Sequence, residues 1–79
     1  MLFVFDKPDT YGFWMKDMRF PIDIIWISGD KVIYVLSEVH PDSYPNLFKP
    51  PIPVDKVLEI NAGLSRKLGI TEGTPFILK

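Results

Sequence analysis

Five residues with polar or stacking side chains are the candidates for a binding site, and two of them carry carboxylates. Asp23 interrupts an apolar run, where a charge is costly to bury unless it is paired. Glu59 and Asn61 point to one side of a strand-like segment. If Asp23 and Glu59 converge, they form a carboxylate pair of the kind used in acid/base hydrolysis. With Trp14 and Lys16 added, we expect a shallow polar pocket lined by all five residues, partly covered by the segment 40–54.

Each polar candidate also has a purely structural interpretation, which we favour. Asp23 can organise the loop before it, either by accepting backbone N–H bonds or by pairing with Lys16 or Arg19. Glu59 can be a solvated side chain on a half-buried strand. Asn61 is among the residues preferred as helix caps.

The aromatic candidates have two interpretations as well. Phe13, Trp14, Met15 and Trp26 can form an aromatic platform for a sugar or a peptide. Large aromatic side chains dominate the cores of small domains, so we favour a core position for this group.

Several other chemistries are excluded by what the chain lacks. It contains no cysteine, which rules out disulfides, thiolate zinc sites and a cysteine nucleophile. His40 is the single histidine, and the serines lack a nucleophile elbow, so we expect neither a metal nor a triad. The net charge is −1 and the nine basic residues are scattered, which argues against nucleic acid. We therefore expect no cofactor and, on balance, no enzymatic activity.

The chain shows no sign of a membrane segment or leader. Asp23, Asp30 and Lys31 interrupt the longest apolar run, which falls well short of the roughly 20 residues a membrane helix needs. The first residues lack the basic start of a signal peptide. These features favour a cytoplasmic protein, or a secreted one if a leader has been removed, and leave the compartment open.

The elements that must position these side chains are mostly strands. A chain of 79 residues, 47% of them hydrophobic, fits one domain spanning residues 1–79. The hairpin over 22–39 has the clearest pattern, and five prolines make 40–54 a loop. We expect a mainly β fold, a small curled sheet, barrel or sandwich of about six strands, with one short helix near residues 62–68 ended by Gly69. The expected strands are residues 1–5, 12–15, 22–27, 32–39, 56–60 and 75–78.

Two blocks of this sequence resemble the DUF192 family, also called UPF0127. The first block, from Gly12 to Ile27, has an aromatic-Trp-Met run, then a basic and a polar residue, then Pro-Ile-Asp. The second block is Val-Leu-Glu-Ile-Asn-Ala-Gly from Val57 to Gly63. The resemblance implies a compact β-rich prokaryotic domain with one short helix and no established activity. It transfers no catalytic residue.

The chain departs from the family pattern at two places. Met18 stands where the family implies a threonine or another small polar residue. The family also implies a further strand before the strand at residues 2–5. Without it, the N-terminal strand has an unpaired edge, for which we expect a homodimer or a strand-exchanged assembly, or else reduced stability.

Three functions follow from these observations, in order of preference. The first is a non-catalytic binding or interaction module for a small ligand or a protein partner. The second is a small hydrolase that uses Asp23 and Glu59. The third is a structural accessory domain.

Overall fold

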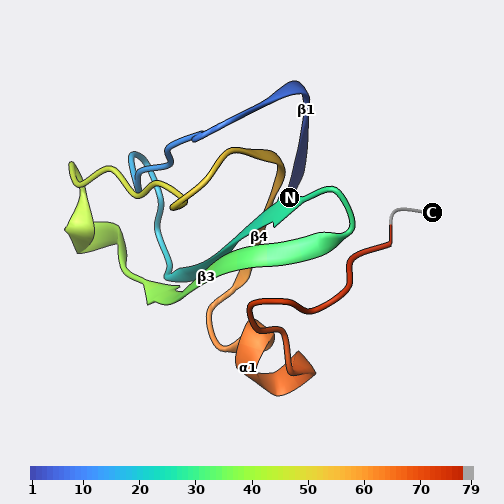
Figure 1. Cartoon of the computed structure of the whole chain (residues 1–79). Coiled ribbons are helices and arrows are strands. Elements are labelled where there is room, and N and C mark those ends of the chain that lie inside the picture. The colour runs from blue at the N-terminus through green and yellow to red at the C-terminus, as the bar shows by residue number, and fades with distance from the viewer. Residues whose placement is uncertain (78–79) are drawn as a thin grey trace.

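The computed structural model describes residues 1–77 and shows one antiparallel sheet with two short helices (Figure 1). Within these residues the elements are β1 (Leu2–Asp9), β2 (Ile22–Ser28), β3 (Lys31–Val39), the 3-10 helix η1 (Pro41–Ser43), β4 (Val54–Asn61) and α1 (Leu64–Leu68). The strands lie in the order β1-β4-β2-β3. β2 is therefore an inner strand between β4 and β3, and β1 lies at one edge.

The expectation of a mainly β fold with one short α-helix is confirmed. Of the three arrangements expected, a small curled sheet, a barrel or a sandwich, the described residues form a sheet that is not closed, and the expected count of about six strands is too high. The sheet is open, and residues 1–77 supply four strands. The expected strand at 12–15 forms only a single bridge, between Phe13 and Phe48. The expected strand at 75–78 is reduced to one bridge from Pro75 to Lys31, and its residue 78 lies outside the described residues. Proline lacks an N–H, so this segment cannot build a regular ladder through that position.

The hairpin, the proline-rich loop and the helix were located correctly. Ser28 pairs with Lys31, which leaves Gly29 and Asp30 as the two-residue turn of the hairpin. Gly29 has φ 61°, a conformation that glycine adopts without steric cost. The first strand extends beyond its expected end into the charged segment 6–9, where its pairing with β4 becomes irregular.

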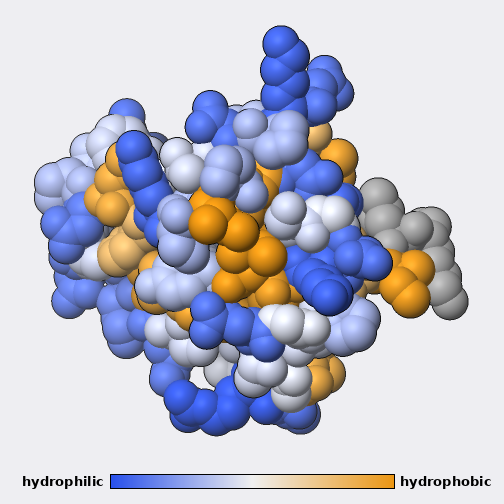
Figure 2. Space-filling view, viewed as in Figure 1, coloured by the Kyte–Doolittle hydropathy of each residue, from blue (hydrophilic) through white to orange (hydrophobic). Residues whose placement is uncertain are grey.

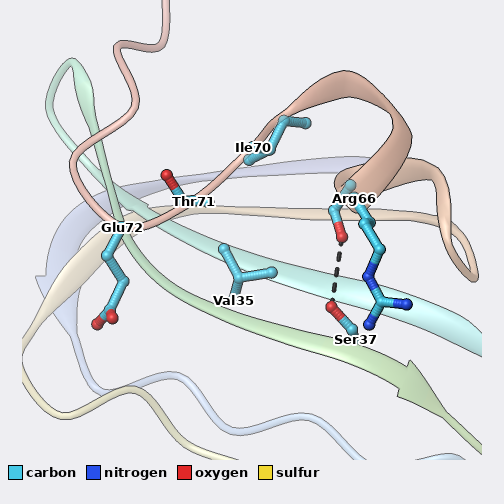
Figure 3. Close-up of a pocket in the computed structure, with 7 residues that line it drawn as sticks. Val35, Ser37, Arg66, Ile70, Thr71 and Glu72 are labelled. Atoms are coloured by element: carbon cyan, nitrogen blue, oxygen red, sulfur yellow. Dashed lines mark hydrogen bonds between the residues drawn. The ribbon is translucent and has the colours of Figure 1, made fainter.

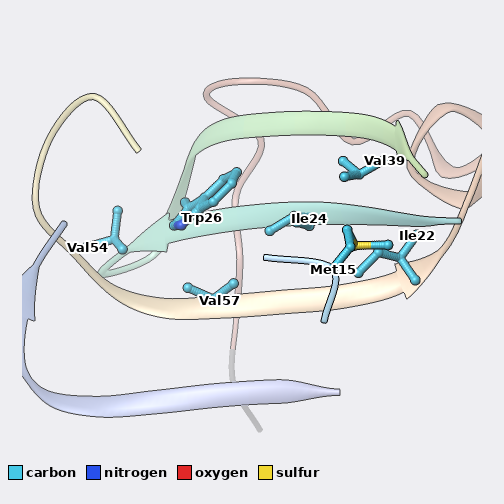
Figure 4. Close-up of a cluster of buried hydrophobic side chains, with 7 residues drawn as sticks. All are labelled: Met15, Ile22, Ile24, Trp26, Val39, Val54 and Val57. Atoms are coloured by element: carbon cyan, nitrogen blue, oxygen red, sulfur yellow. The ribbon is translucent and has the colours of Figure 1, made fainter. Parts of the chain in front are cut away.

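The inner strand β2 is buried on both faces because its side chains alternate between two hydrophobic clusters. Ile24 and Trp26 point to the first cluster, where Val57 of β4 and Met15 of the preceding loop meet them (Figure 4). The segments 10–21 and 40–53 cover this face, supplying Tyr11 and Phe48 among others.

The opposite face of the sheet holds a smaller cluster under the C-terminal third of the chain. Ile25, Ile27 and Val32 form its buried part, and Ile70 and Phe76 pack on them. Asp23 belongs to this face by alternation. The molecule thus has three layers, with loops on one side of the sheet and α1 with the segment that follows it on the other (Figure 1).

The two loops on the first face are fixed to each other and to the core. Phe13 and Phe48 exchange two main-chain hydrogen bonds, both of 2.8 Å. The indole Nε1 of Trp26 donates to the Tyr11 carbonyl oxygen at 2.9 Å. The proline-rich segment is therefore held as a cover over the sheet.

Candidate functional site

Asp23 is fully buried, and its carboxylate accepts four hydrogen bonds. Oδ1 accepts from the main-chain N–H of Glu38 at 2.8 Å and of Gly63 at 3.2 Å. Oδ2 accepts from the main-chain N–H of Ser65 at 2.9 Å and from its hydroxyl at 2.6 Å. The charge is thus balanced by oriented dipoles, and the donors come from β3 and the start of α1 rather than from Lys16 or Arg19.

The N–H groups that donate to Asp23 are available because the backbone is irregular at the end of β3 and at the start of α1. β3 carries an extra residue opposite β2 near Glu38, which has φ 54°, so its N–H turns toward the carboxylate. At α1 the residue before the helix is Gly63, with φ 87° and no side-chain cap. Asn61 does not cap the helix, so that expectation is wrong. Asp23 takes over the role, from a position forty residues earlier in the sequence.

The environment of Asp23 keeps its carboxylate ionised. Burial acts to raise the pKa, since it penalises the charged form, but the bonds from Ser65, Glu38 and Gly63 outweigh it. The pKa of Asp23 is accordingly lowered from its usual value. A carboxylate in this state is an anchor for the backbone rather than a proton donor.

Asp23 and Glu59 lie on opposite faces of the sheet and do not converge. In the β2–β4 register Asp23 pairs with Ile60, whereas Glu59 pairs with Ile24. Directly paired residues point to the same face, and neighbours along a strand point to opposite faces. The two carboxyl groups are therefore separated by the sheet, and this arrangement does not support an acid/base pair.

Glu59 and Asn61 border a hollow of about 300 Å³ at the end of β4. Its other lining side chains are mostly apolar and include Met18 and Phe20. Burial raises the pKa of Glu59, partly offset by the charge of the amino terminus. Neither Trp14, Lys16 nor Asp23 lines this hollow, so the five candidates are not gathered around it.

Trp14 and Lys16 lie in the loop before β2 and are exposed. Trp14 is 47% exposed, so its expected core position is wrong, while Met15 and Trp26 are buried as expected. The ring packs against Tyr44 of the proline-rich loop with 5.2 Å between ring centroids. The Lys16 ammonium lies over the indole, 5.8 Å from its centroid.

A second, polar hollow of about 280 Å³ was not anticipated from the sequence (Figure 3). β3 contributes Val35 and Ser37 to its wall. The remaining lining residues are contributed by α1 and the turn behind it, namely Ser65, Arg66, Ile70, Thr71 and Glu72. The hollow lies on the same face of the sheet as Asp23.

The buried wall of this hollow is held in place by Asp23. Ser65 is almost completely buried, and its hydroxyl proton is committed to the carboxylate. Its oxygen can therefore only accept from Ser37, whose hydroxyl lies 3.4 Å away. This long contact leaves the Ser37 hydroxyl able to turn to a ligand. Individual serines carry no sequence signal for such a site, because the hollow exists only once α1 packs beside β3.

Residues 1–77 contain no group of three or more histidine or acidic side chains placed to hold a metal ion. In the same part of the chain, none of the helices has the length and apolar character that crossing a bilayer requires.

These features define a small mainly β domain with an open sheet covered on both faces and shallow hollows at its margins. The model of DUF192, a family described as "Uncharacterized ACR", matches residues 1–77. The chain therefore belongs to the DUF192 family, as its two sequence blocks predict. No curated protein is significantly similar to it.

Two solved structures share the fold. A protein of unknown function from Novosphingobium aromaticivorans DSM 12444 has a TM-score of 0.85 and 35% identity, covering 92% of this chain and 52% of its own. A "putative transcription regulator" from Sinorhizobium meliloti 1021 has a TM-score of 0.86 and 30% identity, covering 92% and 57%. This chain thus spans little more than half the length of each.

Proposed function

We propose that the chain is a non-catalytic binding module that takes a small polar ligand in the hollow between β3 and α1. The observation that carries this proposal is the wall of the hollow. A buried serine, Ser65, is fixed there by a buried carboxylate, Asp23, and a neighbouring hydroxyl, Ser37, faces the space in front. Rigid polar groups around a small apolar floor are typical of sites that orient a ligand.

The size of the hollow supports a small ligand. Its volume of about 280 Å³ is just below the range of known ligand pockets, which extends from roughly 300 to 1,000 Å³. Three hydroxyl-bearing residues, Ser37, Ser65 and Thr71, line it together with charged residues. A solute with several hydrogen-bonding groups fits this chemistry better than an extended apolar molecule.

The other functions receive less support. The hydrolase needs Asp23 and Glu59 on one side of the sheet, and their register separates them. A role in binding nucleic acid is not proposed, because the net charge is −1. The five residues first considered contribute unequally to the proposed site, with Asp23 behind its wall and the other four elsewhere.

The proposal is tested by recording amide NMR spectra of the ¹⁵N-labelled protein with three probes, D-glucose, inorganic phosphate and the dipeptide Ala-Leu. At least one probe should shift the resonances of Ser37, Ser65 and Thr71. The variant S37L, which fills the space, should abolish the shifts and remain folded, because Ser37 is exposed. K67L, on α1 and outside the hollow, is the control. If none of the probes shifts these residues, the proposal is wrong.

We propose, second, that two copies of the chain associate along β1. This strand lies at the edge of the sheet, and its first half carries no charge or proline. Val4 there is 59% exposed. The second half, with Lys7 and Pro8, has the features by which edge strands resist further pairing, so the contact would be confined to residues 2–5.

Sedimentation velocity over a range of concentrations tests this association. We expect a concentration-dependent dimer that the variant V4K dissociates, since a lysine blunts an exposed edge. The variant K7E, which changes charge outside the contact, should leave the dimer intact. A monomer at every concentration would exclude the association.

A further inference from the structure

We infer that the ligand of the hollow between β3 and α1 is a short zwitterionic peptide, with its carboxylate at Arg66 and its ammonium group at Glu72. This inference rests on the proposed binding function and gives it a ligand class. The juxtaposition that carries it is a cation and an anion at opposite ends of one hollow, with an apolar floor between them (Figure 3).

The two charged ends come from different parts of the chain. Arg66 belongs to α1, and Glu72 follows the turn after it. Figure 3 shows the two side chains on either side of Val35, and no ion pair joins them among residues 1–77. In the described residues, the ion pair of Arg66 is with Glu38, at 3.9 Å and well exposed. Such a pair is weak, and an incoming carboxylate can displace it.

The floor between the charges is apolar. Val35 and Ile70 line the middle of the hollow, and both belong to the hydrophobic cluster on this face of the sheet. In the space-filling view, hydrophobic residues come to the surface in the centre of the face that carries β3, among hydrophilic ones (Figure 2). An aliphatic side chain of a ligand can be buried against this floor.

The charge separation favours a peptide over a single amino acid. The ammonium and carboxylate of an amino acid are attached to one carbon, whereas the side chains of Val35 and Ile70 lie between the two charged ends of the hollow. A dipeptide adds one residue of backbone, or up to about 3.5 Å of reach. Its amide group also gives Ser37 and Thr71 a hydrogen-bonding partner.

The decisive experiment compares three peptides by NMR titration. They are Ala-Leu, its N-acetyl derivative without the ammonium group, and its C-terminal amide without the carboxylate. We expect each blocked peptide to bind about two- to fivefold more weakly than Ala-Leu, the range typical of exposed ion pairs. The shifts should map to the residues from Ser65 to Glu72 and to Ser37.

Two charge variants test which residue binds the carboxylate of the peptide and which binds its ammonium group. R66Q should bind Ala-Leu and its amide equally, because the partner of the carboxylate is gone. E72Q should bind Ala-Leu and the N-acetyl peptide equally. K67Q alters a neighbouring exposed charge outside the hollow. This variant should still bind Ala-Leu more tightly than either blocked peptide.

The outcomes separate this inference from the function it rests on. Equal binding of free and blocked peptides would reject the zwitterion while leaving a ligand site. Shifts with D-glucose or phosphate but not with Ala-Leu would do the same. The absence of shifts with every probe would reject both.

Discussion

The Asp23 carboxylate connects three segments that are distant in sequence. It lies in β2, and its donors are Glu38 at the end of β3, Gly63 before α1 and Ser65 within it. Four bonds to one buried group fix the position of α1 on the sheet and with it the wall of the polar hollow. The side chain therefore supports the proposed site without facing the ligand.

Replacing Asp23 with asparagine should lower the free energy of unfolding at pH 7 by about 2–4 kcal/mol. The amide would place an NH₂ group opposite donors and leave at least one buried N–H unsatisfied, which costs this order of free energy. Urea unfolding of the wild type and of D23N measures the loss. D6N, at an exposed position in β1, is the control and should change stability by less than about 0.5 kcal/mol.

The stabilities of the wild type and D23N should also depend differently on pH in the acidic range. The pKa of Asp23 is lower in the folded protein than its usual value of 3.8, so the unfolded chain binds the proton more readily. The contribution of Asp23 to the free energy of unfolding is therefore complete above pH 3.8. It is lost as the pH falls through the pKa of Asp23 in the folded protein. Wild-type stability should decline more steeply than that of D23N below about pH 4. Parallel curves would show that Asp23 does not titrate in this way.

At the scale of elements, the irregular end of β3 and the short α1 depend on each other. A helix of five residues is too short to be stable alone, and it begins without a side-chain cap of its own. The extra residue in β3 supplies one donor to Asp23 and α1 supplies the others. A substitution that disturbs the backbone of β3 should therefore also destabilise α1.

Glu38 allows the irregular backbone at the end of β3 to be tested. It has a positive φ, which costs a residue with a side chain roughly 1–2 kcal/mol, whereas glycine avoids the clash at a smaller entropic cost. We expect E38G to stabilise the protein by about 0.5–1 kcal/mol and E38V to destabilise it by at least about 1 kcal/mol. Thermal unfolding of E38G, E38V and the wild type gives the order of their stabilities. If E38V were more stable than E38G, the positive φ of Glu38 would be contradicted.

Local patterns predicted some elements and not others, for a physical reason. The hairpin was predicted because its turn residues and both strands are adjacent in sequence. The segments 12–15 and 75–78 have strand-like composition, but a strand also needs a partner in register. Within residues 12–15 and 75–77, the structure has one bridging residue in each segment. Asp23 was expected to need partners, yet Gly63 and Ser65 could not be foreseen, because their N–H groups are placed by a turn forty residues away.

At the scale of the whole molecule, the sheet is open and has two unequal edges. β3 is partly covered at its start, where Val32 donates to the Thr74 carbonyl oxygen and accepts from Gly73 N–H. β1 has β4 as its only strand partner among the described residues, through an irregular register. Composition cannot distinguish an open sheet from a barrel, since both need the same alternation of apolar side chains.

Hydrogen exchange should reflect this layered arrangement. We expect the amides of β2 to exchange most slowly, because β2 has a strand on each side and is covered on both faces. At concentrations where the protein is monomeric, the amides of β1 should exchange fastest among the strands. Exchange rates measured by NMR at one pH give the ranking, and protection of β1 that rises with protein concentration would report the proposed dimer contact.

The pairing of β1 with β4 has a consequence for how the protein is made. Leu2 pairs with Leu58, fifty-six positions later, whereas β2 and β3 are joined by a two-residue turn. Closing a long loop costs more entropy than closing a short one. The hairpin can therefore form early, and β1 pairs with β4 later. On the ribosome, the apolar segment from Leu2 to Phe5 would emerge well before β4 and gain its partner late. A strand that is made long before its partner is exposed to chaperones and neighbouring chains for longer than the strands of the hairpin.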